Sequence, residues 1–84
     1  MSAMRAKMKV SSVSSGFYPE DNKTSETLTL NAVCASSYDS TGLDEDNTYA
    51  RFSPSAELVI TITNPALFDK FVVGEKYYLD FTKA

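Results

Sequence analysis

Two segments of this chain alternate between apolar and polar residues over most of their length, and this period of two constrains the fold more than any other feature. In residues 5–10, apolar side chains alternate with basic ones. In residues 26–35, leucine, alanine and cysteine alternate with threonine and asparagine. Successive side chains of a β-strand point to opposite faces of a sheet, so this pattern is typical of a strand with one buried face. We therefore predict a mainly β protein.

Three further segments read as strands, and the stretches between them are rich in turn-forming residues. Residues 48–53 form a short predicted strand that Pro54 ends, whereas residues 14–25 and 36–47 are predicted loops. The last two strands are expected to turn their larger apolar residues inward. They are residues 56–63, with Leu58, Ile60 and Ile62 inward, and residues 75–82, with Tyr77, Leu79 and Phe81 inward.

One short helix is predicted before the last strand. Asn64 suits an N-cap, and Pro65 suits the first helical position. Leu67, Phe68 and Phe71 would then lie on one face of a helix ending near residue 71. The element order predicts a five-stranded antiparallel barrel or sandwich, similar to oligonucleotide-binding (OB) barrels, that the helix closes at one end.

At 84 residues the chain has room for one domain, expected to span residues 1–84. Its mid-strand apolar residues, Leu30, Ile60 and Leu79, are expected to be almost fully buried. No run approaches the roughly 18 apolar residues of a membrane span, and no signal peptide is evident, so no membrane contact is expected.

The composition argues against catalysis. The chain has no histidine, which removes the usual triads and histidine-based metal sites, and its single cysteine cannot form a zinc site with so few other ligands. We expect no enzymatic activity, no metal and no cofactor. The alternation places Cys34 on an inward face as an inert thiol, and the lack of a disulfide is typical of a reducing cytoplasm.

The most acidic part of the chain is the predicted loop at residues 39–47. Asp39, Asp44, Glu45 and Asp46 supply the hard oxygen ligands that calcium prefers, but their spacing does not match an EF-hand loop. We expect a solvated acidic loop here.

Two surfaces are candidates for binding. The first is a patch in which exposed aromatic and basic side chains would meet if the third and last strands are neighbours: Tyr49, Arg51, Lys76 and Tyr78. The second is the basic face of the first strand: Arg5, Lys7 and Lys9. Tyrosine and arginine are enriched at protein interfaces, but they also form stacking platforms for single-stranded nucleic acid. The net charge of −3 favours a protein partner over a nucleic acid.

Residues 46–81 (DNTYARFSPSAELVITITNPALFDKFVVGEKYYLDF), with the opening MRAKMKVSSV, resemble small uncharacterised proteins of tailed-bacteriophage genomes. The resemblance implies a viral, non-enzymatic protein in the host cytoplasm or the virion. Its partners would be phage structural proteins or a host protein, and the expected role is capsid decoration, capsid cement or a tail component. The alternatives are an OB-like binder of single-stranded nucleic acid or nucleotide, and an inhibitor of a host enzyme or defence protein. Self-association is left open.

Overall fold

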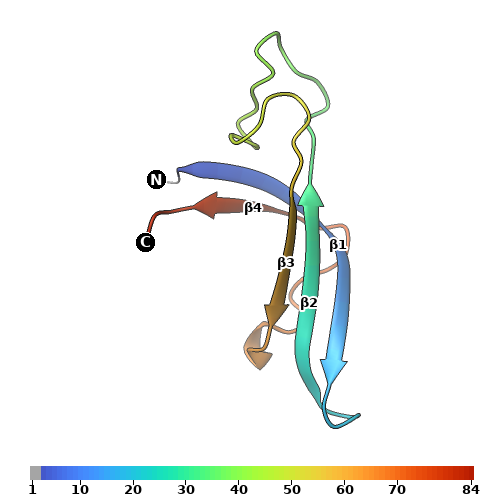
Figure 1. Ribbon diagram of the computed structural model, residues 1–84. Helices are drawn as coiled ribbons and strands as arrows, with labels where there is room; N and C mark the ends of the chain where they lie inside the picture. Colours follow the sequence, from blue (N-terminus) through green and yellow to red (C-terminus); the bar gives the residue numbers. More distant parts are fainter. Residues whose placement is uncertain (1–2) are drawn as a thin grey trace.

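The protein is a single antiparallel sheet whose strands follow the order β3-β2-β1-β4 (Figure 1). The computed structural model describes residues 3–84. The strands are β1 (Met4–Phe17), β2 (Lys23–Ala32), β3 (Glu57–Ile62) and β4 (Lys76–Phe81). The mainly β prediction is confirmed. The predicted five-stranded antiparallel barrel or sandwich is not confirmed, because the sheet of the described residues is open, has four strands, and its edge strands, β3 and β4, do not pair with each other.

The strand register gathers the apolar residues on one face. Leu30 pairs with Val10 on one side and with Leu58 on the other, and Ala6 pairs with Leu79 across β1 and β4. The opposite face carries the basic residues of β1 and the threonines of β2. Within the parts of the four strands that it located, the sequence alternation therefore assigned the two faces correctly. What it could not assign was how completely the apolar face is covered.

A β-bulge bends β1. Val10 pairs with Leu30 and Ser12 with Thr29, so Ser11 is an extra residue whose hydroxyl donates to the Thr29 carbonyl oxygen at 3.0 Å. An extra residue bends a strand and increases its twist, and Figure 1 shows β1 turning sharply part-way along its length. The first half of β1 pairs with β4, and the second half continues alongside β2.

The bulge also explains why the predicted loop at residues 14–25 is longer than the turn observed at residues 18–22. The extra residue moves the inward positions from even to odd numbers, so Val13 lies opposite Leu28 and the simple alternation is lost from the sequence. β1 in fact continues to Phe17, and β2 begins at Lys23. The two strands form a hairpin arm at the lower end of the view in Figure 1. Tyr18, at the start of its turn, is 80% exposed.

The predicted strand at residues 48–53 is also wrong. These residues form turns and bends, and Phe52 has a positive φ of 57° that ends any extended run. Only Thr48 bonds to β1 like a strand residue, by donating its N–H to the Arg5 carbonyl at 3.0 Å. The Asn47 side chain makes the neighbouring hydrogen bonds. It accepts from Lys7 N–H of β1 at 2.9 Å and donates to the Val33 carbonyl at 2.8 Å.

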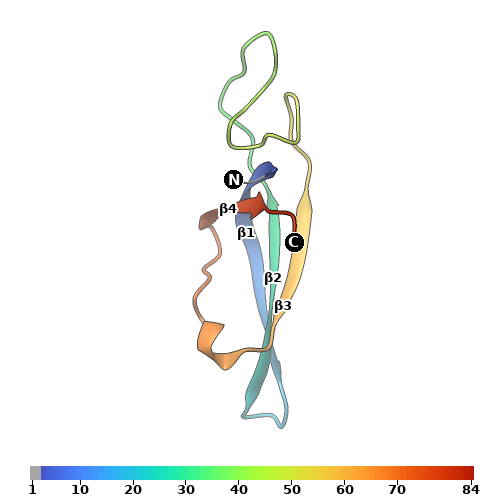
Figure 2. The ribbon, with the colours of Figure 1, turned by 90° about the vertical axis from the view of Figure 1, so that its left-hand side faces the viewer.

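The predicted helix is reduced to one 3₁₀ turn, Pro65–Leu67 (η1). The predicted cap is confirmed, because the Asn64 side chain accepts a hydrogen bond from Ala66 N–H at 3.1 Å. The chain then runs from residue 68 to residue 75 across the apolar face, where Phe68 and Phe71 pack on the core. Figure 2 shows this connection standing off one face of the sheet.

The molecule is long and thin. Its extents are 54 × 29 × 16 Å and its radius of gyration is 15.5 Å, against about 12 Å for a compact domain of this length. The buried hydrophobic core of the described residues is small: Ala6, Met8, Val10, Leu28, Leu30 and Ile62. Leu30 is buried as predicted, but Leu79 is only half-buried and Ile60 is 46% exposed. A large part of the apolar face is therefore open.

Candidate functional site

The open part of the apolar face forms a groove of about 300 Å³ between the two edge strands. Leu58, Ile60 and Ile62 of β3 line one side, and Tyr77 and Leu79 of β4 line the other. Leu67 of η1 and Phe71 of the connection complete the lining. Leu28 and Leu30 form its floor. A second hollow of about 150 Å³ shares Leu58 and Leu79 with this groove and extends it toward Met4 and Phe81.

The groove is exposed at its rims. Ile60 is 46% exposed on the β3 side, Leu67 is 47% exposed in η1, and Phe81 is 48% exposed at the end of β4. Contiguous apolar surface of this kind, with strand edges beside it, is typical of a site that binds another chain. We call this surface the apolar groove.

The strand edges beside the groove carry backbone groups that can bind an extended chain. Ala32 N–H donates to the Ala56 carbonyl at 3.0 Å, so the even-numbered residues of β3 turn their backbone groups toward β2. The N–H and C=O groups of the odd-numbered residues, Glu57, Val59 and Thr61, therefore point away from the sheet.

The predicted patch does not assemble. Tyr49 packs on the core from the apolar side, whereas Tyr78 lies on the polar face with Lys76. Arg51 is exposed in the loop, where its Nε donates to the Thr41 carbonyl at 3.0 Å. The prediction assumed that residues 48–53 form a strand beside β4, and no such strand exists in the described part of the chain.

Tyr78 instead belongs to a polar network with the basic face of β1. The Arg5 guanidinium lies 4.4 Å from the centre of the Tyr78 ring and binds Asp80 through two hydrogen bonds, at 2.7 and 3.2 Å. The Tyr78 hydroxyl donates to Asp46 at 2.8 Å, and Lys7 Nζ binds the other oxygen of that carboxylate at 3.2 Å. The hydrogen bond from Tyr78 lowers the pKa of Asp46, with Lys7 contributing in the same direction.

This network neutralises most of the predicted basic face. Arg5 and Lys7 both have carboxylate partners, so only Lys9 of that set has no ion pair among residues 3–84. The acidic residues that neutralise the face come from β4 and from the loop, far from β1 in sequence. Charge alternation along one strand could not reveal them.

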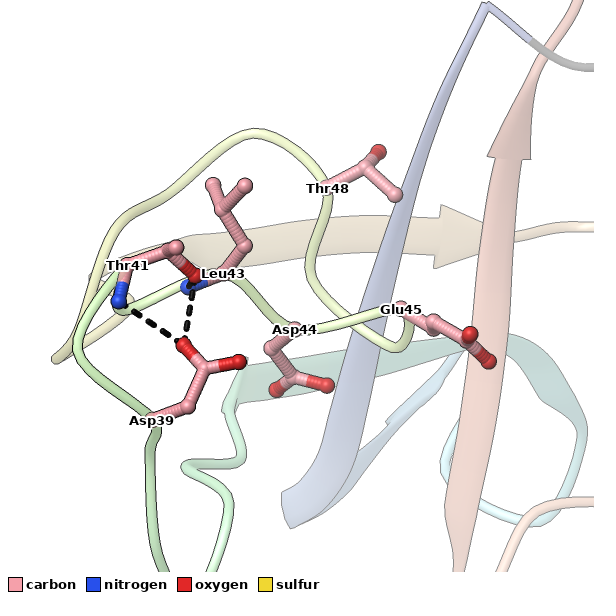
Figure 3. A pocket seen from close by; sticks show the side chains of 6 residues that line it. All are labelled: Asp39, Thr41, Leu43, Asp44, Glu45 and Thr48. Carbon is pink, nitrogen blue, oxygen red and sulfur yellow. Dashed lines mark hydrogen bonds between the residues drawn. The ribbon is translucent and has the colours of Figure 1, made fainter.

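The predicted acidic loop extends beyond the end of β2 (Figure 1), and an open hollow there is lined by Asp39, Asp44 and Glu45, among others (Figure 3). Asp39 is used within the loop, where it accepts hydrogen bonds from the N–H and hydroxyl of Thr41. The hydroxyl bond is the largest cause of the lowered pKa of Asp39. Within residues 3–84 no group of three or more acidic, cysteine or histidine side chains is arranged to hold a metal ion.

Cys34 is exposed, which contradicts its predicted burial. The sequence alternation extends to residue 35, but β2 ends at Ala32, so the inward position predicted for the thiol is lost.

In the described part of the chain, no helix is long and apolar enough to cross a membrane.

Comparisons with protein families, curated proteins and solved structures find no match to this chain. The resemblance to phage proteins therefore remains a prediction from the sequence.

Proposed function

We propose that this protein is a non-enzymatic β-domain that binds another protein chain in its apolar groove, and that it serves as a small component of a tailed-phage virion. The observation that carries the binding role is the groove itself, which is lined by apolar side chains and lies between two unpaired strand edges. The virion role rests on the sequence resemblance.

The shape of the molecule supports a partner. A chain of 84 residues buries a modest fraction of its surface even when compact, and this one is far from compact. An apolar segment from a partner would cover the groove and complete the core. Such burial contributes about 25 cal/mol for each square ångström of apolar surface removed from water.

The edges beside the groove favour an extended polypeptide as the ligand. An extended chain can pair with the outward N–H and C=O groups of β3 while its alternate side chains enter the groove. Lipids and nucleotides offer no such repeating backbone pattern. The partner segment is therefore expected to be a β-strand with apolar residues at every second position.

The alternative role, binding of single-stranded nucleic acid, has less support. A phosphate-binding surface needs basic side chains that are free to neutralise phosphates. Asp80 and Asp46 already neutralise Arg5 and Lys7, and the tyrosines of the predicted stacking platform lie on opposite faces. Inhibition of a host enzyme or defence protein would use the same groove and differs only in the identity of the partner.

The proposal is tested by incorporation into virions, with two variants of neighbouring residues. Ile60 and Val59 are both exposed on β3, at 46% and 58%, but Ile60 faces the groove and Val59 faces the polar side. Ile60→Lys should abolish incorporation, as measured by mass spectrometry of purified virions from complemented infections, whereas Val59→Lys should be incorporated like wild type.

Absence of the wild-type protein from virions would overturn the virion role. Equal incorporation of both lysine variants would overturn the role of the groove. Circular dichroism of the purified variants establishes that each one is folded before its incorporation is compared.

A further inference from the structure

We propose that two copies of this protein associate through their β4 strands, edge to edge and antiparallel, to form one continuous eight-stranded sheet. This inference goes beyond the proposed function, because a monomer could still bind a partner in its groove. It rests on the backbone pattern of β4, on the charges along that strand, and on a like-charge pair that the monomer leaves uncompensated.

The backbone pattern fixes which residues can pair. Val10 N–H donates to the Glu75 carbonyl at 2.9 Å and Ala3 N–H to the Phe81 carbonyl at 2.7 Å, so odd-numbered residues of this segment turn toward β1. The backbone groups of Lys76 and Tyr78 therefore point away from the sheet, and β4 is its outermost strand.

A two-fold axis at Tyr78 gives the register with the fullest overlap of outward-facing residues. It sets Tyr78 opposite the same residue of the second copy, and Lys76 opposite Asp80 of the second copy. These are hydrogen-bonded pairs of an antiparallel ladder. On the apolar side, Tyr77 meets Leu79 of the second copy, so the two apolar faces become continuous.

The charges favour this register. Lys76 lies directly opposite Lys9 in the β1–β4 pair, and within residues 3–84 neither lysine has an ion pair. Like charges directly opposite one another destabilise a sheet. In the dimer, Asp80 of the second copy would lie beside Lys76 while it keeps its own Arg5. Each acid would then lie between two cations.

Pairing of β4 with β3 of another copy is less favourable. Glu57, Val59 and Thr61 are the outward-facing residues of β3, as the Ala32–Ala56 hydrogen bond shows. Full antiparallel overlap with β4 would set Glu57 opposite Asp80, which places two acids side by side. The like charges disfavour both an open chain of copies and closure of one copy into a barrel.

The test is sedimentation velocity of the purified full chain, from low micromolar to several hundred micromolar. Wild type should form a dimer. Lys76→Glu should raise the dissociation constant by about tenfold or more, because it sets an acid opposite Asp80 at two symmetric places. Lys9→Glu is the matched control. It makes the same change in net charge and removes the same lysine pair, but it lies one strand away from the interface, so it should weaken the dimer clearly less than Lys76→Glu does.

Val59→Pro is a second control, at the other edge. The Val59 N–H points away from β2, so proline there leaves the β2–β3 ladder intact while blocking any pairing through β3. This variant should also remain a dimer.

A wild type that stays monomeric at every concentration would overturn the proposal. So would equal weakening by Lys76→Glu and Lys9→Glu, or loss of the dimer in Val59→Pro alone. A monomer that is still incorporated into virions would leave the proposed function intact, so the failure of one proposal is distinguishable from the failure of the other.

Discussion

Glu26 and Asn47 are the buried polar side chains of residues 3–84, and each holds a loop on the sheet. Glu26 lies on the apolar face, where one carboxylate oxygen accepts from Lys23 Nζ at 2.8 Å and from Asp69 N–H at 3.1 Å. The second bond ties the connection after β3 to the sheet. Asn47 does the same for the loop beside β1. Burying a polar side chain is unfavourable unless it is hydrogen-bonded, so these contacts fix where the two loops lie.

We predict that Glu26→Gln destabilises the protein at neutral pH and that the difference narrows in acid. The ion pair with Lys23, aided by Asp69 N–H, lowers the pKa of Glu26. A carboxyl with a lowered folded pKa stabilises the fold above its unfolded pKa, about 4.3, and this contribution is lost as the pH falls through the folded pKa. Urea denaturation of both proteins at about pH 7 and about pH 3 measures the difference. A difference that does not change with pH would show that the charge of Glu26 is not what stabilises the fold.

The strands show which elements a sequence pattern can and cannot predict. Alternation located β2, β3 and β4 and assigned their faces, because a period of two is visible within a single strand. The second half of β1 was missed, since the bulge at Ser11 shifts the alternation and the following serines resemble a loop. Residues 48–53 have the composition of a strand but not its conformation, and beside them β1 is bonded by the Asn47 side chain at Lys7 and by the Thr48 N–H at Arg5.

The candidate site was less predictable than the strands. The polar network joins residues of β1, β4 and the loop, and pairs such as Lys7 with Asp46 form only once the chain is folded. The apolar groove could not be predicted from the sequence for a different reason. A strand pattern gives the apolar face of β3, but not whether another strand covers it. Ile60 was therefore predicted to be buried, although it lines an open groove.

Alanine substitutions should separate the covered part of the apolar face from the open part. Leu30 is 4% exposed, so Leu30→Ala should cost about 2–5 kcal/mol of unfolding free energy. Ile60→Ala should cost about 1 kcal/mol or less, because water already reaches much of that side chain. Chemical denaturation of the two variants in parallel gives both values. A cost for Ile60→Ala as large as that for Leu30→Ala would mean that the groove is closed in solution.

At the scale of the whole molecule, the net charge and the shape indicate which class of partner the protein suits. The net charge is −3, and much of the basic face is neutralised within the fold. The thin, extended sheet leaves apolar surface that a compact domain would bury. These properties suit association with another protein chain better than association with a polyanion.

A titration with single-stranded DNA tests this choice. We predict no measurable binding at about 50 or about 200 mM salt, and no difference between wild type and a Lys7→Ala, Lys9→Ala double variant. Fluorescence anisotropy of a labelled oligonucleotide is a suitable measurement. Micromolar or tighter binding that falls steeply with salt, and that weakens in the double variant, would favour the nucleic-acid role instead.

The central claim is that the sheet is open at β3, and amide hydrogen exchange of the isolated protein tests it most directly. If β3 is an unpaired edge, the amides of Ile60 and Ile62 are protected by β2, whereas those of Val59 and Thr61 exchange at nearly the rate of an unprotected amide. We predict this alternation along β3 by NMR. Equal protection of all four amides would show that another strand covers the edge, and it would contradict the account of an open sheet with a groove available to a partner.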